Sequence, residues 1–324
     1  MATLKAFSLQ RFGQTFTSIE SPPRFSGLER LGYDFRPNYV AFPLGGRVSL
    51  PRMHYVDEGP REGSKTILCL HGEPSWSFLY RKMVPVLVRA GYRVVVPDFI
   101  GFGKSDKYTS ADNYTHELHT ASVRLLLDHL GLRSHVILVC QDWGGLTGLS
   151  VVKDMPGTFE ALVLMNMPFF WLKLMQDGWT ADLLPFLVWR QSTSLFGNML
   201  SVKFLFKYVF GFSAEVADAY DAPFPDPWHR GGVARWPLLV PLFKDDPVAP
   251  HMIQVIKCLK TWNKPALVMF SNKDPVTRGI EEHFMKTIPN AMKVNIKGGG
   301  HMLQESHGEE LANNVVSFLS PKRD

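Results

Sequence analysis

The sequence places an aspartate where a carboxylate could act as a nucleophile. Residues 136–145 read Val-Ile-Leu-Val-Cys-Gln-Asp-Trp-Gly-Gly, a buried-strand pattern that runs into small residues able to open a helix. A sharp strand-to-helix turn of this kind presents a reactive side chain, here Asp142, and the small residues Cys140 and Gly144 leave it room. The helix N-terminus also favours negative charge. An aspartate that only caps the helix is the competing interpretation, and this segment alone does not separate the two.

Two later residues could complete a catalytic triad with Asp142. His301 follows the glycine run Gly298–Gly300, which lets a loop carry the imidazole back over the turn. Asp274 follows a strand-like run and could accept a hydrogen bond from that imidazole, although an aspartate before a proline is also a common turn residue. The loop after Met165 offers only Asn166 and Met167, neither of them a carboxylate. The chain order nucleophile, acid, base therefore predicts Asp142, Asp274 and His301.

A loop that could stabilise an oxyanion precedes these residues. His71-Gly72-Glu73-Pro74 follows an apolar strand-like run and precedes a helical pattern. In this position a backbone N–H of Glu73, together with that of Trp143, would hold the oxyanion formed when an ester on Asp142 is attacked. The alternative is an ordinary Gly-Pro turn.

An aspartate nucleophile restricts the reaction class. A carboxylate can displace a leaving group at saturated carbon to give an alkyl ester, which water activated by His301 then hydrolyses. Halide displacement and epoxide opening both fit this scheme. An epoxide oxygen needs a proton donor, whereas a departing halide needs desolvated N–H donors, and the Trp143 indole is a donor without acceptor function. Trp143 therefore favours halide chemistry.

The elements that would position these residues alternate between strand and helix patterns, which predicts a mostly parallel sheet flanked by helices. The expected strands are 66–70, 92–97, 135–140, 161–165, 265–270 and 293–296, with 39–44 and 47–56 as an antiparallel opening pair. The expected helices are 78–90, 114–130, 144–154, 280–287 and 309–319. Between Pro168 and Asn263 the alternation stops in a segment rich in Phe, Trp and Leu, which predicts an inserted helical cap.

Together these residues resemble the haloalkane dehalogenases of the subfamily with an Asp-His-Asp triad. The resemblance rests on His71–Pro74, Gln141–Gly145, Asp274 and His301, and it spans nearly the whole chain. It implies an α/β-hydrolase fold, with a mostly parallel eight-stranded sheet in residues 1–167 and 264–324 and a cap in residues 168–263. It also implies that haloalkane, water and halide bind without a metal or organic cofactor.

That subfamily pairs the tryptophan beside the nucleophile with a second one from the cap. Other subfamilies have an Asn after the oxyanion His-Gly, where this chain has Glu73, so the resemblance makes a second tryptophan necessary. Trp189 matches the family's placement best and Trp179 next. The further candidates are Trp171, Trp228, Trp236 and, at the far edge, Trp262.

The resemblance also implies a substrate pocket and leaves two other functions open. We expect the pocket walls to be Leu146, Phe224, Pro225, Val276 and Met302. Epoxide hydrolases share the triad and often Asp-Trp-Gly-Gly, and the cap offers Tyr208 and Tyr220 as proton donors; Gln141 and Glu73 favour the dehalogenase. A catalytically inactive binding protein is the third alternative, although a binding module has no chemical reason to keep the complete constellation.

Composition excludes several other classes. The 324 residues are 45% hydrophobic, and 35 basic against 30 acidic residues are spread without a long run of either sign, so we expect no nucleic-acid partner. Three cysteines give no disulfide framework. No run of eighteen apolar residues occurs, and Lys5 and Arg11 make a poor leader, so we expect a cytoplasmic protein without a membrane span. A monomer or a weak homo-oligomer is the separate expectation for its assembly.

Overall fold

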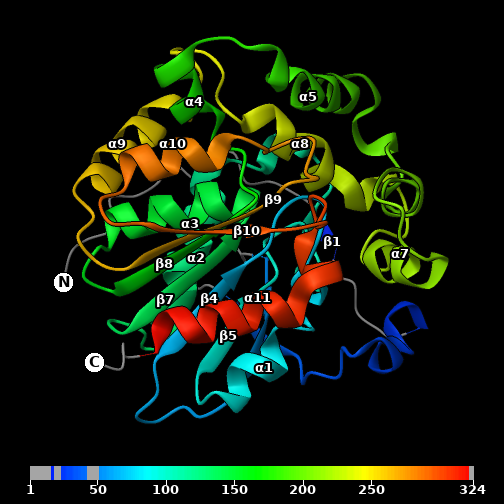
Figure 1. The fold of residues 1–324 in the computed structure, drawn as a ribbon. Helices are drawn as coiled ribbons and strands as arrows, with labels where there is room; N and C mark the ends of the chain where they lie inside the picture. The colour runs from blue at the N-terminus through cyan, green and yellow to red at the C-terminus, as the bar shows by residue number, and fades with distance from the viewer. Residues whose placement is uncertain (1–15, 18–22, 42–50, 321–324) are drawn as a thin grey trace, which may run out of the picture.

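The computed structural model describes residues 16–17, 23–41 and 51–320. Lys5 and Arg11, weighed above as parts of a leader, lie outside these residues, as do residues 42–50 of the predicted opening strand pair. The described part contains an eight-stranded sheet in the order β10-β9-β8-β7-β4-β5-β3-β2 and a two-stranded sheet, β1-β6 (Figure 1). The predicted fold class, a mostly parallel eight-stranded sheet with an inserted helical segment, is confirmed.

Six neighbouring strands of the main sheet run parallel, and two antiparallel strands close one side. The strands are β2 (Asn38–Val40), β3 (Met53–Glu58), β4 (Thr66–Leu70), β5 (Arg93–Pro97), β7 (Val136–Gln141), β8 (Phe159–Met165), β9 (Ala266–Ser271) and β10 (Met292–Ile296), while β1 (Phe16–Thr17) pairs with β6 (Lys107–Tyr108). Strands β4, β5, β7 and β9 are buried at every position, which explains their continuous runs of aliphatic residues: helices cover both faces of a parallel sheet.

Helices cover the sheet on both sides (Figure 1). On one side lie α1 (Val84–Arg89) and α11 (Leu303–Leu319), which pack against each other. On the other side α3 (Trp143–Asp154) packs against both α2 (His116–His129) and α9 (Ala249–Lys260), and α9 contacts α10 (Ile280–Thr287). The core therefore lies in two layers, one on each face of the sheet.

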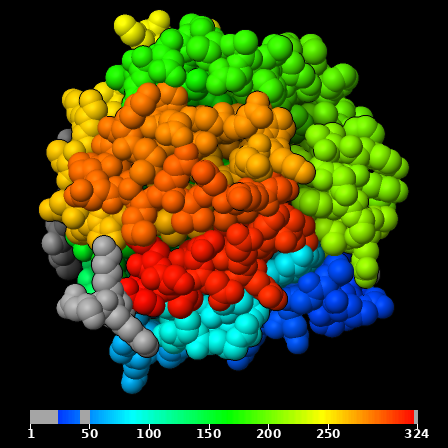
Figure 2. All heavy atoms as spheres, viewed as in Figure 1, coloured from blue at the N-terminus to red at the C-terminus, as the bar shows by residue number. Residues whose placement is uncertain are grey.

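The segment inserted between β8 and α9 is helical. It contains α4 (Phe170–Asp177), α5 (Leu184–Phe196), α6 (Val202–Phe204), the π-helix η7 (Leu205–Val209), α7 (Ala214–Asp221) and α8 (Gly231–Leu239). In Figure 2 this segment, in green and yellow-green, lies across the top and right of the orange and red C-terminal part. Helix α9 lies inside the predicted cap range 168–263 and packs on both α3 and α4. The division into core and cap stays a prediction.

Two predicted helices have different bounds for local reasons. The pattern over 78–90 is divided into a 3₁₀ turn, η3 (Ser77–Tyr80), and α1, because Pro85 stands at the start of α1, where its missing N–H costs nothing. The closing helix begins at Leu303 rather than 309, with a kink at His307 (φ −127°, ψ 21°). Its first turn, directly after His301, is therefore oriented separately from the rest of the helix.

Candidate active site

Asp142 lies on a strained turn between β7 and α3. Its φ of 51° and ψ of −128° are unusual for a residue with a side chain, and such backbone costs about 1–3 kcal/mol. The neighbours must be glycines because a Cβ on Gly72 would lie 2.2 Å from Cβ of Asp142, and one on Gly144 would lie 2.2 Å from the Leu70 carbonyl oxygen. The strain and the crowding together hold the Asp142 carboxylate in one place.

The Asp142 side chain does not cap helix α3. It makes no hydrogen bond to the helix N-terminus. Instead, its Oδ1 accepts a hydrogen bond of 2.8 Å from the backbone N–H of Glu73, and its Oδ2 lies 3.4 Å from Nε2 of His301. The structure thus favours the nucleophile interpretation over the capping one.

The loop that carries Glu73 is shaped by its own side chains. His71 Nδ1 donates to the Gly72 carbonyl oxygen at 2.9 Å, while its Nε2 accepts from the backbone N–H of Phe99 at 3.1 Å. Burial lowers the pKa of His71, in keeping with a neutral ring that donates with one nitrogen and accepts with the other. Ser75 closes the turn through its backbone N–H and hydroxyl, both on Gly72. The Glu73 amide therefore points at Asp142 from a fixed turn.

His301 and Asp274 complete a buried triad. His301 Nδ1 donates to Oδ2 of Asp274 at 2.9 Å, and Asp274 is fully buried. Burial alone would raise the pKa of Asp274, but the charge and hydrogen bond of His301, with further bonds from Thr277 and Val276, lower it. Burial would also lower the pKa of His301, but the two carboxylates outweigh it and raise the pKa well above its usual range. The two acids thus stabilise an imidazolium.

Trp143 presents an unused donor beside the nucleophile. The side chain is 2% exposed, lines the same cavity as Asp142, and its Nε1 has no hydrogen-bond partner among the described residues. A buried N–H without a partner is costly, and a bound anion would satisfy it. Trp236 stacks on Trp143 with ring centroids 5.3 Å apart and an interplanar angle of 27°, which fixes the indole plane.

Of the six candidate cap tryptophans, Trp189 is the one that lines this cavity. The Glu73 carboxyl group lines the same cavity, and its pKa is raised well above its usual range by burial and by the charge of Asp142. Trp179 is 54% exposed and packs on Phe243. Trp236 is fully buried and donates from Nε1 to His119. The remaining three, Trp171, Trp228 and Trp262, lie outside the cavity wall.

The cavity is mainly apolar and has a volume of about 760 Å³. Two of the predicted wall residues, Val276 and Met302, line it. The other three do not. Leu146 is buried within α3, Phe224 is buried against the ring of Phe102, and Pro225 is exposed. The motif at residues 220–225 did not indicate which of its side chains face the cavity.

Sequence reasoning missed the cap residues that make up much of the wall. They are aliphatic and aromatic and carry no chemical signature. They are Phe186, Val188, Leu205, Val209, Phe210, Phe212, Pro237 and Val240. The spacing of residues 205 and 209, one turn apart on the helical segment η7, is a signal that could have found two of them.

The two cap tyrosines are not placed for epoxide opening. The Tyr220 hydroxyl is fully buried and donates to Oε2 of Glu305 at 2.8 Å, while Tyr208 is 65% exposed. Neither lines the cavity formed by the described residues. The described wall of that cavity therefore lacks the tyrosine proton donors that would favour an epoxide substrate.

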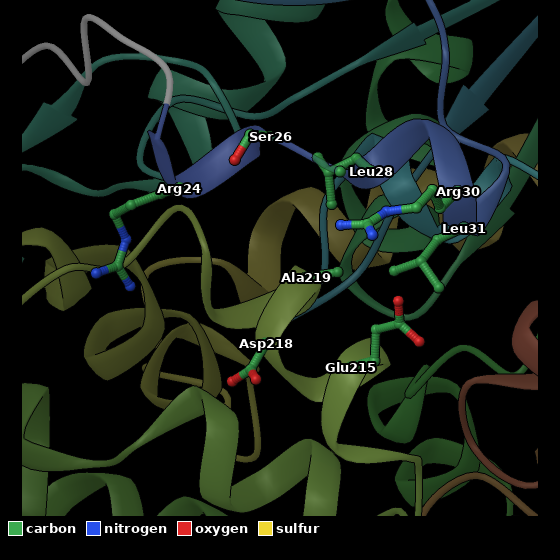
Figure 3. A pocket seen from close by; sticks show the side chains of 9 residues that line it. Arg24, Ser26, Leu28, Arg30, Leu31, Glu215, Asp218 and Ala219 are labelled. Carbon is green, nitrogen blue, oxygen red and sulfur yellow. The ribbon is translucent and has the colours of Figure 1, made fainter.

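A second cavity of about 320 Å³ lies between residues 24–31 and α7 (Figure 3). Its charged residues include Arg24, Arg30, Glu215 and Asp218, and Arg24 already pairs with Asp221 at 3.5 Å. None of the predicted site residues lines it. The second cavity is therefore no part of the predicted site.

Among residues 16–17, 23–41 and 51–320, no group of three His, Cys, Asp or Glu side chains could hold a metal ion. No helix in these ranges is long and apolar enough to cross a membrane. Cys69 and Cys140 are buried free thiols whose pKa values are raised by burial.

Comparison with known proteins agrees with this geometry. The α/β hydrolase fold family matches residues 65–308. A haloalkane dehalogenase of Psychrobacter cryohalolentis is 39% identical over 91% of this chain and 95% of its own length. Haloalkane dehalogenase 1 of Mycobacterium tuberculosis is 40% identical over 89% and 94%.

A solved structure is similar as well. The tetrameric haloalkane dehalogenase DpaA of Paraglaciecola agarilytica superposes with a TM-score of 0.83 at 35% identity, covering 94% of this chain and all of DpaA. With relatives this similar over nine tenths of its length, an aspartate at the nucleophile turn and a buried Asp-His-Asp triad, the chain belongs to the haloalkane dehalogenase family of α/β-hydrolase-fold proteins.

Proposed function

We propose that this protein hydrolyses carbon–halogen bonds in haloalkanes through an alkyl ester on Asp142. One observation carries the proposal: Asp142 faces an apolar cavity in which the Trp143 indole N–H has no partner among the described residues. A serine at this position would instead be suited to attack on carbonyl groups. The cavity wall supplied by α5, η7 and α8 acts as a cap over the reacting carbon. An apolar enclosure strengthens the few polar interactions inside it.

In the first step, Asp142 attacks the carbon that bears the halogen. A bond forms between Oδ2 and carbon while the carbon–halogen bond breaks, and the bonding pair leaves with the halide. Oδ1 stays in contact with the Glu73 amide, so this oxygen becomes the ester carbonyl. We propose that the indole N–H groups of Trp143 and Trp189 bind the halide, because desolvated N–H donors stabilise a charge that develops in the transition state.

In the second step, His301 removes a proton from water, and the hydroxide adds to the ester carbonyl carbon. Ester formation has removed the negative charge of Asp142, one of the two charges that raise the pKa of His301. The pKa of His301 is therefore lower in the ester than in the free enzyme, which favours the neutral ring that a base requires. The backbone amides of Glu73 and Trp143 would hold the oxyanion, and Asp274 stabilises the imidazolium. The bond between Oδ2 and the alkyl carbon is retained in the alcohol: the acyl C–O bond breaks, the alkoxide takes the proton held by His301 and leaves as the alcohol, and the new carboxyl group of Asp142 loses its proton to water.

The proposal is tested against epoxide hydrolysis by two parallel reactions. Purified protein is given 1-bromobutane in one and styrene oxide in the other, and bromide and diol are measured. We expect bromide release without comparable diol formation. Diol as the main product would favour epoxide opening, and silence in both reactions would favour an inactive binding protein.

We further propose that the protein self-associates, which is the oligomeric alternative of the sequence analysis. The tetrameric state of DpaA supports this. So does a set of exposed apolar side chains on the inserted segment: Leu184, Val188, Leu195, Phe196, Met199, Phe204, Tyr208 and Val209. Light scattering at several concentrations should give a mass above that of one chain. A cytoplasmic location stays a prediction.

A further inference from the structure

Asn166 contacts all three loops that carry the triad. It follows β8 directly, and β8 lies between β7, which ends at the Asp142 turn, and β9, which leads to Asp274. Its backbone carbonyl accepts from the Asp142 N–H at 3.2 Å. Its side chain is fully buried and reaches the other two loops. The middle strand of the three thus supplies a residue that touches each catalytic loop.

The side-chain amide of Asn166 is oriented by its partners. Oδ1 accepts from the backbone N–H of Ser271 at 2.9 Å, three residues before Asp274. Nδ2 lies 3.0 Å from the carbonyl oxygen of Gly300 and 3.2 Å from that of His301. Because an N–H cannot accept and a carbonyl cannot donate, the amide fits in only one of its two orientations. Nδ2 also lies 2.9 Å from the Ser271 hydroxyl oxygen, so its two protons serve three acceptors.

The backbone at Asn166 explains why this residue type is used. Its φ is 31°, in the left-handed region that asparagine tolerates better than most residues with a side chain. Glycine would allow this φ but supply no amide. Aspartate would place a carboxylate oxygen against two carbonyl oxygens. Of the residues able to adopt this backbone, asparagine has a side chain of the right length that carries both the acceptor for the Ser271 N–H and the donor for the carbonyl oxygens of the His301 loop.

We propose that Asn166 is a positioning residue for the second half-reaction: its side chain sets the distance and angle between His301 and Asp274. The inference rests on the proposed function for its kinetic readout. Asn166 touches neither the cavity nor the reacting atoms, so it acts through His301. The contact with Asp142 runs through the backbone carbonyl, which every substitution retains. Loss of the amide should therefore leave alkylation of Asp142 in place and slow hydrolysis of the ester.

The test uses Asn166→Gly, which permits the positive φ and removes only the side chain. Asn290→Gly is the matched control, because Asn290 also has a positive φ (59°) but is exposed in the loop between α10 and β10. With excess 1-bromobutane and rapid quenching, Asn166→Gly should still release one bromide per site in the first turnover. Ester hydrolysis should then slow by about 10- to 100-fold, as for a catalytic group displaced by about 1 Å. Asn290→Gly should match the wild type.

A milder variant keeps the test informative if Asn166→Gly folds poorly. Ser271→Ala removes the hydroxyl that accepts from Asn166 and donates to Gly300 at 3.0 Å. It should slow the same step by about fivefold, the worth of one hydrogen bond. Two results would overturn the proposal. One is ester hydrolysis at the wild-type rate in both variants. The other is a first-turnover bromide release that falls by the same factor as steady-state turnover, because the substitution would then only reduce the number of folded sites.

A second readout does not depend on the reaction. The Nδ1 proton shared between His301 and Asp274 should give a low-field proton NMR signal, identified by its loss in His301→Phe. We expect the signal to shift or broaden in Asn166→Gly and to stay unchanged in Asn290→Gly. An unchanged signal in Asn166→Gly would contradict the positioning role. Absence of bromide release by the wild type would instead refute the proposed function, and the NMR signal would still test the positioning role.

Discussion

Nε2 of His301 lies 3.4 Å from Oδ2 of Asp142, while Nδ1 of the same ring is bonded to Asp274 at 2.9 Å. The imidazole thus stands between two carboxylates with different tasks. One carboxylate is open to the cavity and can form an ester; the other is fully buried and can only orient the ring. In the proposed mechanism this arrangement separates the bond-breaking step, which would need Asp142, from the hydrolytic step, which would need His301.

Replacement of the base should separate the two steps in time. His301→Phe retains Asp142, the Glu73 amide and the cavity but removes the group that activates water. We expect one bromide per active site from 1-bromobutane, followed by a stall. A rapid-quench bromide assay measures this amplitude, and steady release over many turnovers would show that another group is the base.

The two cap tryptophans allow a matched test of halide binding. Trp189 lines the cavity, whereas Trp179 is half-exposed beside Phe243. Trp189→Phe should weaken iodide binding by about tenfold or more, because a hydrogen bond to a charged group is lost. Trp179→Phe should leave it unchanged. Iodide quenching of intrinsic fluorescence measures both, and equal affinities in the two variants would remove Trp189 from the halide site.

Neutralising the buried acid should lower the rate without loss of the fold. In Asp274→Asn the amide cannot accept from Nδ1 as the carboxylate does, so the ring loses its favoured tautomer and the imidazolium its stabilising charge. Turnover should fall by up to roughly 10⁴-fold, with bromide release in the first turnover much less affected. Circular dichroism checks the fold, and Asp128→Asn, on the exposed side of α2, is the control. Wild-type turnover would mean that another carboxylate orients His301.

The hydrolytic step should depend on pH in a definite direction. Asp274 and Asp142 raise the pKa of His301, and ester formation removes the contribution of Asp142. Water activation requires the neutral ring, which forms above this pKa, so ester hydrolysis should accelerate with rising pH and level off. Single-turnover measurements from about pH 5 to 10 cover the range in which an ordinary histidine titrates and the higher values expected beside Asp274. A rate constant for ester hydrolysis that does not change over this range would exclude His301 as the base.

Strands and loops with a strong local signal could be predicted from the sequence, and the cap could not. The sequence predicts strand β4 at its observed bounds because four consecutive apolar residues follow Thr66 and favour a buried strand. Asp142, His301 and Asp274 were found because each follows an apolar strand or a glycine run. Phe224 shows the limit. Its side chain is large and apolar, but contact with Phe102 in the core, rather than any local pattern, decided where it packs. The sequence shows Asn166 only as a position without a carboxylate, because its hydrogen bonds go to residues more than a hundred positions away.

The covalent ester on Asp142 is tested most directly by mass spectrometry of the trapped intermediate. His301→Phe is incubated with 1-bromobutane, digested and compared with the His301→Phe/Asp142→Ala double variant. We expect a butyl adduct on the peptide that contains Asp142, in an amount equal to the bromide released, and none in the double variant. An adduct on another residue, or bromide release without any adduct, would contradict nucleophilic attack by Asp142.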